Sequence, residues 1–112
     1  MSFFNVKELP KKEVKKGVTV SSVFLKDLML TYFEIEPETE IPAHKHPHQQ
    51  ISFILEGEME FKLGRGTRIL KPGEGAVVPP NTEHSARSLT GVKVVDAWNP
   101  IREDYVISKK KP

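Results

Sequence analysis

The segment Pro42-Ala43-His44-Lys45-His46-Pro47-His48-Gln49-Gln50 holds three of the four histidines of the chain within five residues. His44 and His46 are separated by one residue, so on an extended strand both imidazoles project from the same side and could bind one ion. The fourth histidine, His84, lies far along the chain, and antiparallel pairing could bring it to the first three. The segment therefore predicts a metal site built on β-strands.

The sequence around this segment favours short strands over helices. Between Gly17 and Ser108, β-branched or alternating runs are separated by turn residues at spacings of roughly ten residues. This pattern is typical of an all-β sandwich or a closed barrel. The predicted strands are Val18–Leu25, Leu28–Ile35, Glu40–His44, Gln50–Leu55, Glu58–Leu63, Thr67–Leu70, Gly75–Val78, Glu83–Ser88 and Val92–Trp98, with a last extended piece at Tyr105–Ser108.

The strand Gln50–Leu55 carries apolar residues on one side, whereas its other side begins with the polar residues Gln50 and Ser52. A polar side that faces the inside of a barrel predicts a ligand cavity. The apolar side would then be covered by another sheet or by a second subunit. Alternatively, Ser52 is only a tolerated polar residue in a core strand.

Size and charge limit the class of protein. At 112 residues the chain is expected to form one domain, 1–112. A net charge of +2 is too small to indicate nucleic acid as a partner. Lysines cluster at 11–16 and 109–111, which we interpret as solvated ends, with binding of a polyanion as the alternative.

The absence of cysteine excludes disulfides and thiolate ligands, so a metal ion must use histidine, carboxylate, amide or water. No apolar run reaches the length of a membrane span, and no membrane partner is expected. The first residues lack the basic and apolar regions of a signal peptide, which makes a cytoplasmic location the expectation.

The histidines belong to a longer pattern that resembles the two motifs of the cupin family. Three residues separate His46 from Gln50, and six separate Gln50 from Gly57, as in the first motif. In the second, five residues separate Gly73 from Pro79, and His84 follows Asn81 after two more. The resemblance implies an all-β cupin double-stranded β-helix, or jelly-roll barrel, with its barrel core at about 28–98 and His44, His46, Gln50 and His84 as metal ligands.

The sequence departs from the cupin pattern at Glu38, Asn81, Ser88 and, most importantly, Gln50, where cupins commonly have glutamate. A set of three histidines and one glutamine is neutral, so one divalent ion would keep its full charge, attract an anionic ligand and act as a Lewis acid. The ion could be Zn, Ni, Mn or Fe. A cupin that has partly lost its metal is the alternative.

A second candidate wall lies at Val92–Trp98, where Asp96 and Trp98 share a face. Pro100 bends the chain, which would let Arg102 turn back towards the opening of the barrel that Asp96 and Trp98 face. We interpret Asp96 as a proton-transfer group, Trp98 as an apolar wall and Arg102 as a carboxylate clamp. Alternatively, Asp96 and Arg102 form a structural ion pair. His48 is a candidate substrate contact at the rim, with a plain surface position as the alternative.

A narrower resemblance concerns His-x-His-Pro-His-x-Gln, followed by Asp-x-Trp-x-Pro-x-Arg-x-Asp-Tyr, which is similar to small cupins of the KdgF type. Those proteins help to open the ring of unsaturated monouronates from pectin and alginate. The resemblance implies the metal set above, with Asp96, Trp98 and Arg102 lining the active site, and a small anionic sugar or other carboxylate as ligand. Trp98 stands where those cupins usually have phenylalanine.

Two other functions remain open from the sequence, namely a dioxygenase that uses Fe or Mn and a non-catalytic sugar-binding or sensing module. Small cupins also resemble one another in forming homodimers. The segment Phe3–Val6 and the strand Val18–Leu25 are the predicted contacts of such a dimer.

Overall fold

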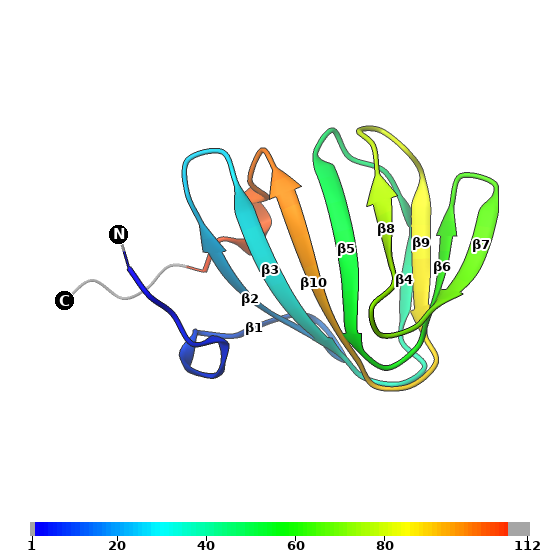
Figure 1. Cartoon of the computed structure of the whole chain (residues 1–112), viewed down its shortest axis with the longest axis horizontal. Coiled ribbons are helices and arrows are strands. Elements are labelled where there is room, and N and C mark those ends of the chain that lie inside the picture. Colours follow the sequence, from blue (N-terminus) through cyan, green and yellow to red (C-terminus); the bar gives the residue numbers. More distant parts are fainter. Residues whose placement is uncertain (1, 108–112) are drawn as a thin grey trace.

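The computed structural model describes residues 2–107 and contains two antiparallel β-sheets, with short 3-10 helices η1 (Val6–Glu8) and η2 (Glu103–Tyr105) (Figure 1). No helix within the described range is long and apolar enough to cross a membrane. The strands are β1 (Lys12–Lys15), β2 (Val18–Phe24), β3 (Met29–Ile35), β4 (Glu40–His44), β5 (Gln49–Glu56), β6 (Met59–Leu63), β7 (Gly66–Leu70), β8 (Gly75–Val78), β9 (His84–Ser88) and β10 (Val92–Asn99).

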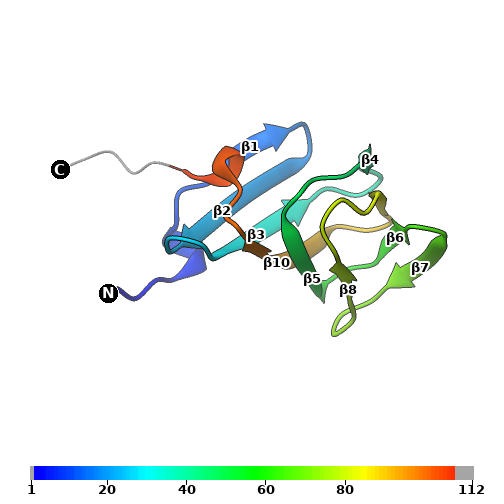
Figure 2. The ribbon, with the colours of Figure 1, turned by 90° about the horizontal axis from the view of Figure 1, so that it is seen from above.

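The larger sheet has the strand order β1-β2-β3-β10-β5-β8, and the smaller has β4-β9-β6-β7. From β3 onwards the chain passes back and forth between the two sheets, as Figures 1 and 2 show. β1 and β2 lie at the end of the larger sheet that is remote from β6 and β7 (Figure 2). This arrangement confirms the predicted all-β jelly roll.

The core forms where the inner faces of the two sheets meet. Alternating residues of β3 and β10 are buried, as expected for strands with one face inward. The predicted inward face of β6 is also confirmed, because Met59 and Phe61 are buried. The central cluster consists of Val18, Val20, Phe33, Ile35, Ile54, Met59, Phe61, Leu70, Val78, Val92 and Val94.

The structure corrects two expectations and narrows a third. Lys12–Lys15 is not simply a solvated end but the edge strand β1, paired with β2. Tyr105 ends the 3-10 helix η2 instead of starting an extended piece, and Ser108 and the lysines at 109–111 lie outside the described residues. The outer face of β5 is half-exposed and no sheet within residues 2–107 covers it, which leaves a second subunit as the expected cover.

The turn between β8 and β9, which lies just before His84, adopts the left-handed conformation at Asn81. Asn81 has a φ of 60°, which agrees with the tolerance of asparagine for this region at a position where cupins have glycine. Its backbone N–H donates to the carbonyl of His46 at 2.7 Å. This bond joins the β8–β9 turn to the histidine segment, so the turn helps to position the candidate ligands.

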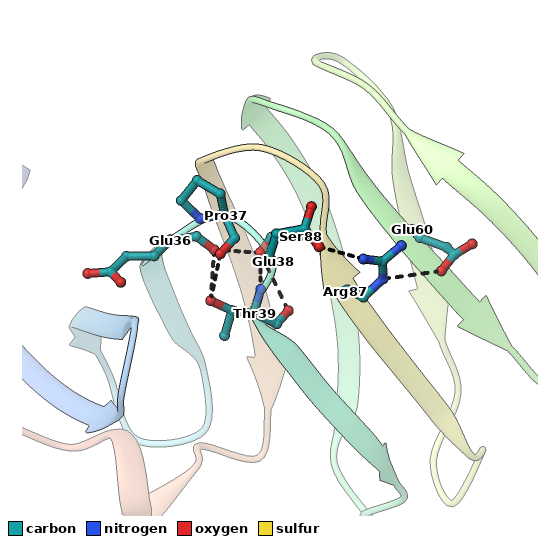
Figure 3. A network of polar contacts seen from close by, with 7 residues as sticks. All are labelled: Glu36, Pro37, Glu38, Thr39, Glu60, Arg87 and Ser88. Carbon is teal, nitrogen blue, oxygen red and sulfur yellow. Dashed lines mark hydrogen bonds and ion pairs between the residues drawn. The ribbon is translucent and has the colours of Figure 1, made fainter.

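Ser88 joins the β3–β4 turn to the end of β9 (Figure 3). Its Oγ accepts from the Thr39 N–H at 2.9 Å and donates to the Glu36 carbonyl. Ser88 is fully buried, so its own hydroxyl depends on these two bonds and not on solvent. On the exposed side, Arg87 pairs with Glu38 at 2.7 Å, a weaker restraint because water screens it.

We expect Ser88→Ala to lower the free energy of unfolding by about 1–3 kcal/mol, because the part-buried Thr39 N–H loses its acceptor and the Glu36 carbonyl keeps only the Thr39 hydroxyl as a donor. Urea unfolding measures the change. Ser85→Ala, on the same strand, removes a hydroxyl that bonds to none of the described residues and should cost less than about 0.5 kcal/mol. Equal losses for the two variants would contradict this role of Ser88.

Candidate functional site

Three histidines from different parts of the chain converge inside one end of the sandwich. His44 ends β4 and lies opposite His84, the first residue of β9, in the antiparallel register. His46 follows in the loop before β5, with its ring centroid 4.9 Å from that of His84. One nitrogen of each ring lies within 4.8 Å of the others, a spacing that could hold a metal ion. The predicted meeting of His84 with the first cluster is confirmed.

Backbone carbonyls determine which ring nitrogen of each histidine faces the site. The Nδ1 atoms of His44, His46 and His84 lie 2.8, 3.1 and 2.8 Å from the carbonyl oxygens of residues 42, 48 and 82. A carbonyl oxygen can only accept, so each Nδ1 carries the proton and each Nε2 keeps a lone pair. His84 Nε2 is buried and has no partner. Three converging lone pairs on neutral rings fit a divalent ion.

Burial also favours the neutral form of the two buried rings, His46 and His84. Loss of solvent is the main cause that lowers the pKa of His46 and His84 below the usual value. The positive charge of Arg102 lowers both further. A metal ion competes with protons for the imidazole nitrogens, so a low pKa favours metal binding near neutral pH.

Gln50 faces inward from β5 beside the histidines and is almost fully buried. Its Oε1 lies 3.0 Å from His46 Nε2, and its Nε2 donates to Ser52 Oγ at 2.9 Å. Because Oε1 and the unprotonated His46 Nε2 are both acceptors, a cation between them would satisfy both. This geometry fits the predicted fourth ligand, whose role in metal binding remains a prediction.

Asp96 and Trp98 face the same interior from β10, which lies between β3 and β5 (Figure 1). The register places Asp96 opposite Ser52 and Trp98 opposite Gln50. Trp98 Nε1 donates to Thr31 Oγ1 at 2.9 Å, a bond that fixes the indole as a wall of the cavity. The predicted second wall is therefore adjacent to the histidine cluster.

Asp96 is a buried carboxyl group with unusual surroundings. Burial raises its pKa to about 7, although a hydrogen bond from Ser52 and the charge of Arg102 oppose the shift. Its Oδ1 has no hydrogen-bond partner among the described residues. A carboxyl group that titrates near neutral pH and has a free oxygen beside a cavity can take up and release a proton.

Arg102 does not form the alternative ion pair with Asp96. Its Nε and Nη2 instead bind both carboxylate oxygens of Asp104, at 3.1 and 2.9 Å. The guanidinium also lies over the rings of Trp98 and Tyr105, at 4.8 and 4.5 Å from their centroids. Arg102 lines the cavity, as expected, but it is held there by residues that sequence reasoning assigned no role, Asp104 and Tyr105.

His48 lies beside Trp98, with 6.4 Å between ring centroids, and is half-exposed. Its backbone carbonyl accepts from His46, which couples it to the candidate metal site. The cavity between the two sheets has a volume of about 140 Å³ and is mostly apolar, with polar groups from His44, Gln50, Ser52, His84, Asp96 and Arg102. His48 itself does not line this cavity, so its substrate contact remains a prediction.

Solved structures resemble this chain over nearly its full length. An RmlC-like cupin from Shewanella frigidimarina superposes with a TM-score of 0.90 at 27% identity, covering 95% of this chain and 96% of that one. KdgF from a Halomonas species superposes with a TM-score of 0.89 at 30% identity, covering 95% and 99%.

Curated relatives match over shorter stretches. H2HPP isomerase from Bacillus subtilis is 33% identical over 70 residues, which is 62% of this chain and 29% of the isomerase. The dimethylsulfoniopropionate lyase DddQ from Ruegeria pomeroyi is 42% identical over 48 residues, 42% of this chain and 24% of the lyase. This chain thus corresponds to less than a third of either protein.

The family comparison agrees with the solved structures. The model described as "Cupin domain" matches residues 31–98, close to the barrel core expected from the sequence. With its jelly roll and its three-histidine cluster, the chain belongs to the cupin family.

Proposed function

We propose that this protein is a metal-dependent enzyme that opens the ring of unsaturated uronate monosaccharides. The observation that carries the proposal is Asp96, a buried carboxyl group with a pKa of about 7 on the cavity that His44 and His84 also line, next to the three-histidine cluster. Ring opening of such a sugar is an isomerisation, which moves a proton without gain or loss of atoms. A group that holds and releases a proton near neutral pH suits that reaction.

His44, His46, Gln50 and His84 would hold one divalent ion, Zn, Ni, Mn or Fe. When bound, the ion supplies a Lewis acid whose full positive charge attracts the carboxylate and polarises an oxygen of the sugar. A neutral ligand set therefore suits an anionic substrate better than a neutral one.

Asp96 would take the proton of the anomeric hydroxyl group, so that the C1 carbonyl forms as the bond between C1 and the ring oxygen breaks, and it would return that proton to the C4 carbon of the resulting enolate. Its free Oδ1 is the atom available for this transfer. Ser52 holds the carboxylate by a hydrogen bond. Since the group is buried, bulk water does not compete for the proton.

Arg102 would bind the acid group of the sugar through Nη1, the guanidinium nitrogen that Asp104 does not use. The rings of Trp98 and Tyr105 keep the guanidinium at the cavity. Trp98 would contact the apolar face of the sugar, and His48 would meet it at the rim.

The relatives support this class of chemistry. KdgF from Halomonas shares the fold over nearly the whole chain, and the curated relatives are named an isomerase and a lyase. Neither name denotes an oxidation, which favours isomerisation over a dioxygenase reaction. Because this chain covers less than a third of those two relatives, their own reactions are not transferred to it.

We also propose that two copies of the chain associate through the outer face of the larger sheet. The register aligns Leu30, Ala97, Ile51 and Val77 in one row across four neighbouring strands. Ile51 and Val77 are 53% and 67% exposed. This face is a more continuous apolar surface than the predicted contacts at Phe3–Val6 and Val18–Leu25.

The size and the rim of this face suit a second copy. Its large side chains are each 40% to 67% exposed and form one patch, as expected for the apolar core of an interface that buries about 800 Å² per partner. The members are Leu30, Ile51, Phe53, Leu55 and Val77. One end of the face is bordered by Glu34, Lys93 and Glu56, which are cross-strand neighbours and supply a charged rim.

The metal site predicts one divalent ion per chain by elemental analysis of protein purified without chelator. His84→Ala should lose the ion because one of three converging lone pairs is removed. His48→Ala, in the same segment, should retain it and serves as the control. Absence of a stoichiometric ion, or equal loss from both variants, would contradict the proposed site.

The proposed reaction predicts that metal-loaded protein accelerates linearisation of an unsaturated monouronate, followed by NMR. Asp96→Asn should lower the rate by about 10²–10⁴-fold, whereas Asp27→Asn, on the surface, should leave it unchanged. Because the base must be ionised, kcat/KM of the unmodified protein should fall tenfold per pH unit below about pH 7. Oxygen consumption with Fe(II), or ligand binding without turnover, would refute ring opening in favour of a dioxygenase or a binding module.

The proposed dimer predicts twice the chain mass by light scattering. Phe53→Lys should give monomers because it places a charge in the centre of the apolar face. Ile69→Lys is the matched control, since Ile69 is equally exposed but lies on the smaller sheet. A monomeric unmodified protein, or dissociation by Ile69→Lys alone, would refute this surface.

A further inference from the structure

We propose that Ser52 is a positioning residue that holds the side-chain amide of Gln50 with its oxygen towards the three histidines. The inference deepens the proposed function, because it rests on Gln50 as a metal ligand. It assigns a task to a small residue that the sequence left open as a tolerated polar position in a core strand.

The four polar groups form a continuous chain along the inside of the larger sheet. His46 Nε2 lies 3.0 Å from Gln50 Oε1, and Gln50 Nε2 donates to Ser52 Oγ at 2.9 Å. Asp96 lies directly opposite Ser52 on the neighbouring strand, and the Ser52 hydroxyl is one of the groups that lower the pKa of its carboxyl group. All four side chains are less than 9% exposed, so the chain of bonds is shielded from solvent.

A glutamine ligand has a difficulty that a glutamate ligand lacks. The amide can rotate by half a turn and exchange its oxygen for its NH₂ group at nearly the same position. The oxygen binds a cation, whereas the NH₂ group has no lone pair to offer and repels one. Gln50 therefore needs a partner that distinguishes its two ends.

The serine hydroxyl alone does not distinguish them, because it can both donate and accept. Asp96 supplies the missing direction. An ionised carboxylate only accepts, and Asp96 lies opposite Ser52 in the register, so its charge favours the rotamer in which the single hydroxyl proton of Ser52 points towards it. Ser52 Oγ then presents only lone pairs to Gln50, and the Gln50 NH₂ group binds there. The amide oxygen is thereby directed towards His46 Nε2.

The position of Ser52 in the sheet places its hydroxyl between Gln50 and Asp96. Gln50 and Ser52 are two residues apart on β5 and face the same side, while β10 brings Asp96 opposite Ser52. The same register places Trp98 opposite Gln50, so the indole closes the other side of the amide. A side chain larger than serine would fill the space between Gln50 and Asp96.

The test is a double-mutant cycle that measures Zn²⁺ affinity at pH 8, where Asp96 is ionised, by competition with a chelating dye. Ser52→Ala should raise the Zn²⁺ Kd by about 10–100-fold. Combined with Gln50→Glu, the same substitution should change the Kd less than about twofold, because the two oxygens of a carboxylate are equivalent and need no orientation.

Two further variants separate orientation from packing. Ser52→Cys keeps the size of the side chain but offers only a weak hydrogen-bonding group, so it should also raise the Kd in the Gln50 background. Ser21→Ala is the matched control, since Ser21 is an equally buried serine on the larger sheet whose hydroxyl has no partner. It should leave the Kd unchanged.

An unchanged Kd for Ser52→Ala and Ser52→Cys would overturn the inference. An equal rise with and without Gln50→Glu would also overturn it, because Ser52 would then act through something other than the amide orientation. The readout needs no substrate, so it is independent of turnover. A metal-binding protein that shows the predicted cycle but does not open uronates would refute the proposed function and leave this inference standing.

Discussion

The register of β10 between β3 and β5 is the constraint on which the site depends. It places Asp96 opposite Ser52 and Trp98 opposite Gln50, and it brings Thr31 within reach of the indole nitrogen. Because strand side chains alternate between two faces, a slip of one residue would turn Asp96 and Trp98 outwards together. The buried apolar residues of β10 resist such a slip, since Val92 and Val94 would be exposed by the same movement. Core packing therefore holds the polar wall in register.

The electrostatics of the cavity follow from burial on both walls. Desolvation lowers the pKa of His46 and His84 and raises that of Asp96, so it disfavours charge on either side. A cation among the histidines and an anion at Asp96 would each relieve the cost of the other. Arg102 adds a fixed positive charge at the cavity, held in place by Asp104.

Much of the fold and the histidine cluster could be predicted from the sequence. Alternation located most strands to within one or two residues, and the spacing from His46 to Gly57 and from Gly73 to His84 indicated how the histidines meet. β1 was missed because lysines at its ends resemble a solvated run, although Val14 packs against the core. The contacts of Arg102 with Asp104 and Tyr105 depend on a short 3-10 turn after Pro100. The alternation of apolar and polar residues does not predict a turn of this kind. The connection from Gln50 through Ser52 to Asp96 could not be predicted either, because it joins two strands that are distant in sequence.

The main-chain carbonyls of Pro42, His48 and Thr82 orient the three histidines. Every residue type supplies such a carbonyl, so side-chain substitutions at these three positions leave the acceptor in place as long as the backbone path is kept. The three histidines and the side chains that line the cavity around them can therefore change independently during evolution. Walls such as Trp98 and Arg102 are free to be exchanged for other shapes and charges while the imidazoles keep their tautomers. A scaffold of this kind can acquire a new reaction by altering its lining and need not rebuild its metal chemistry each time.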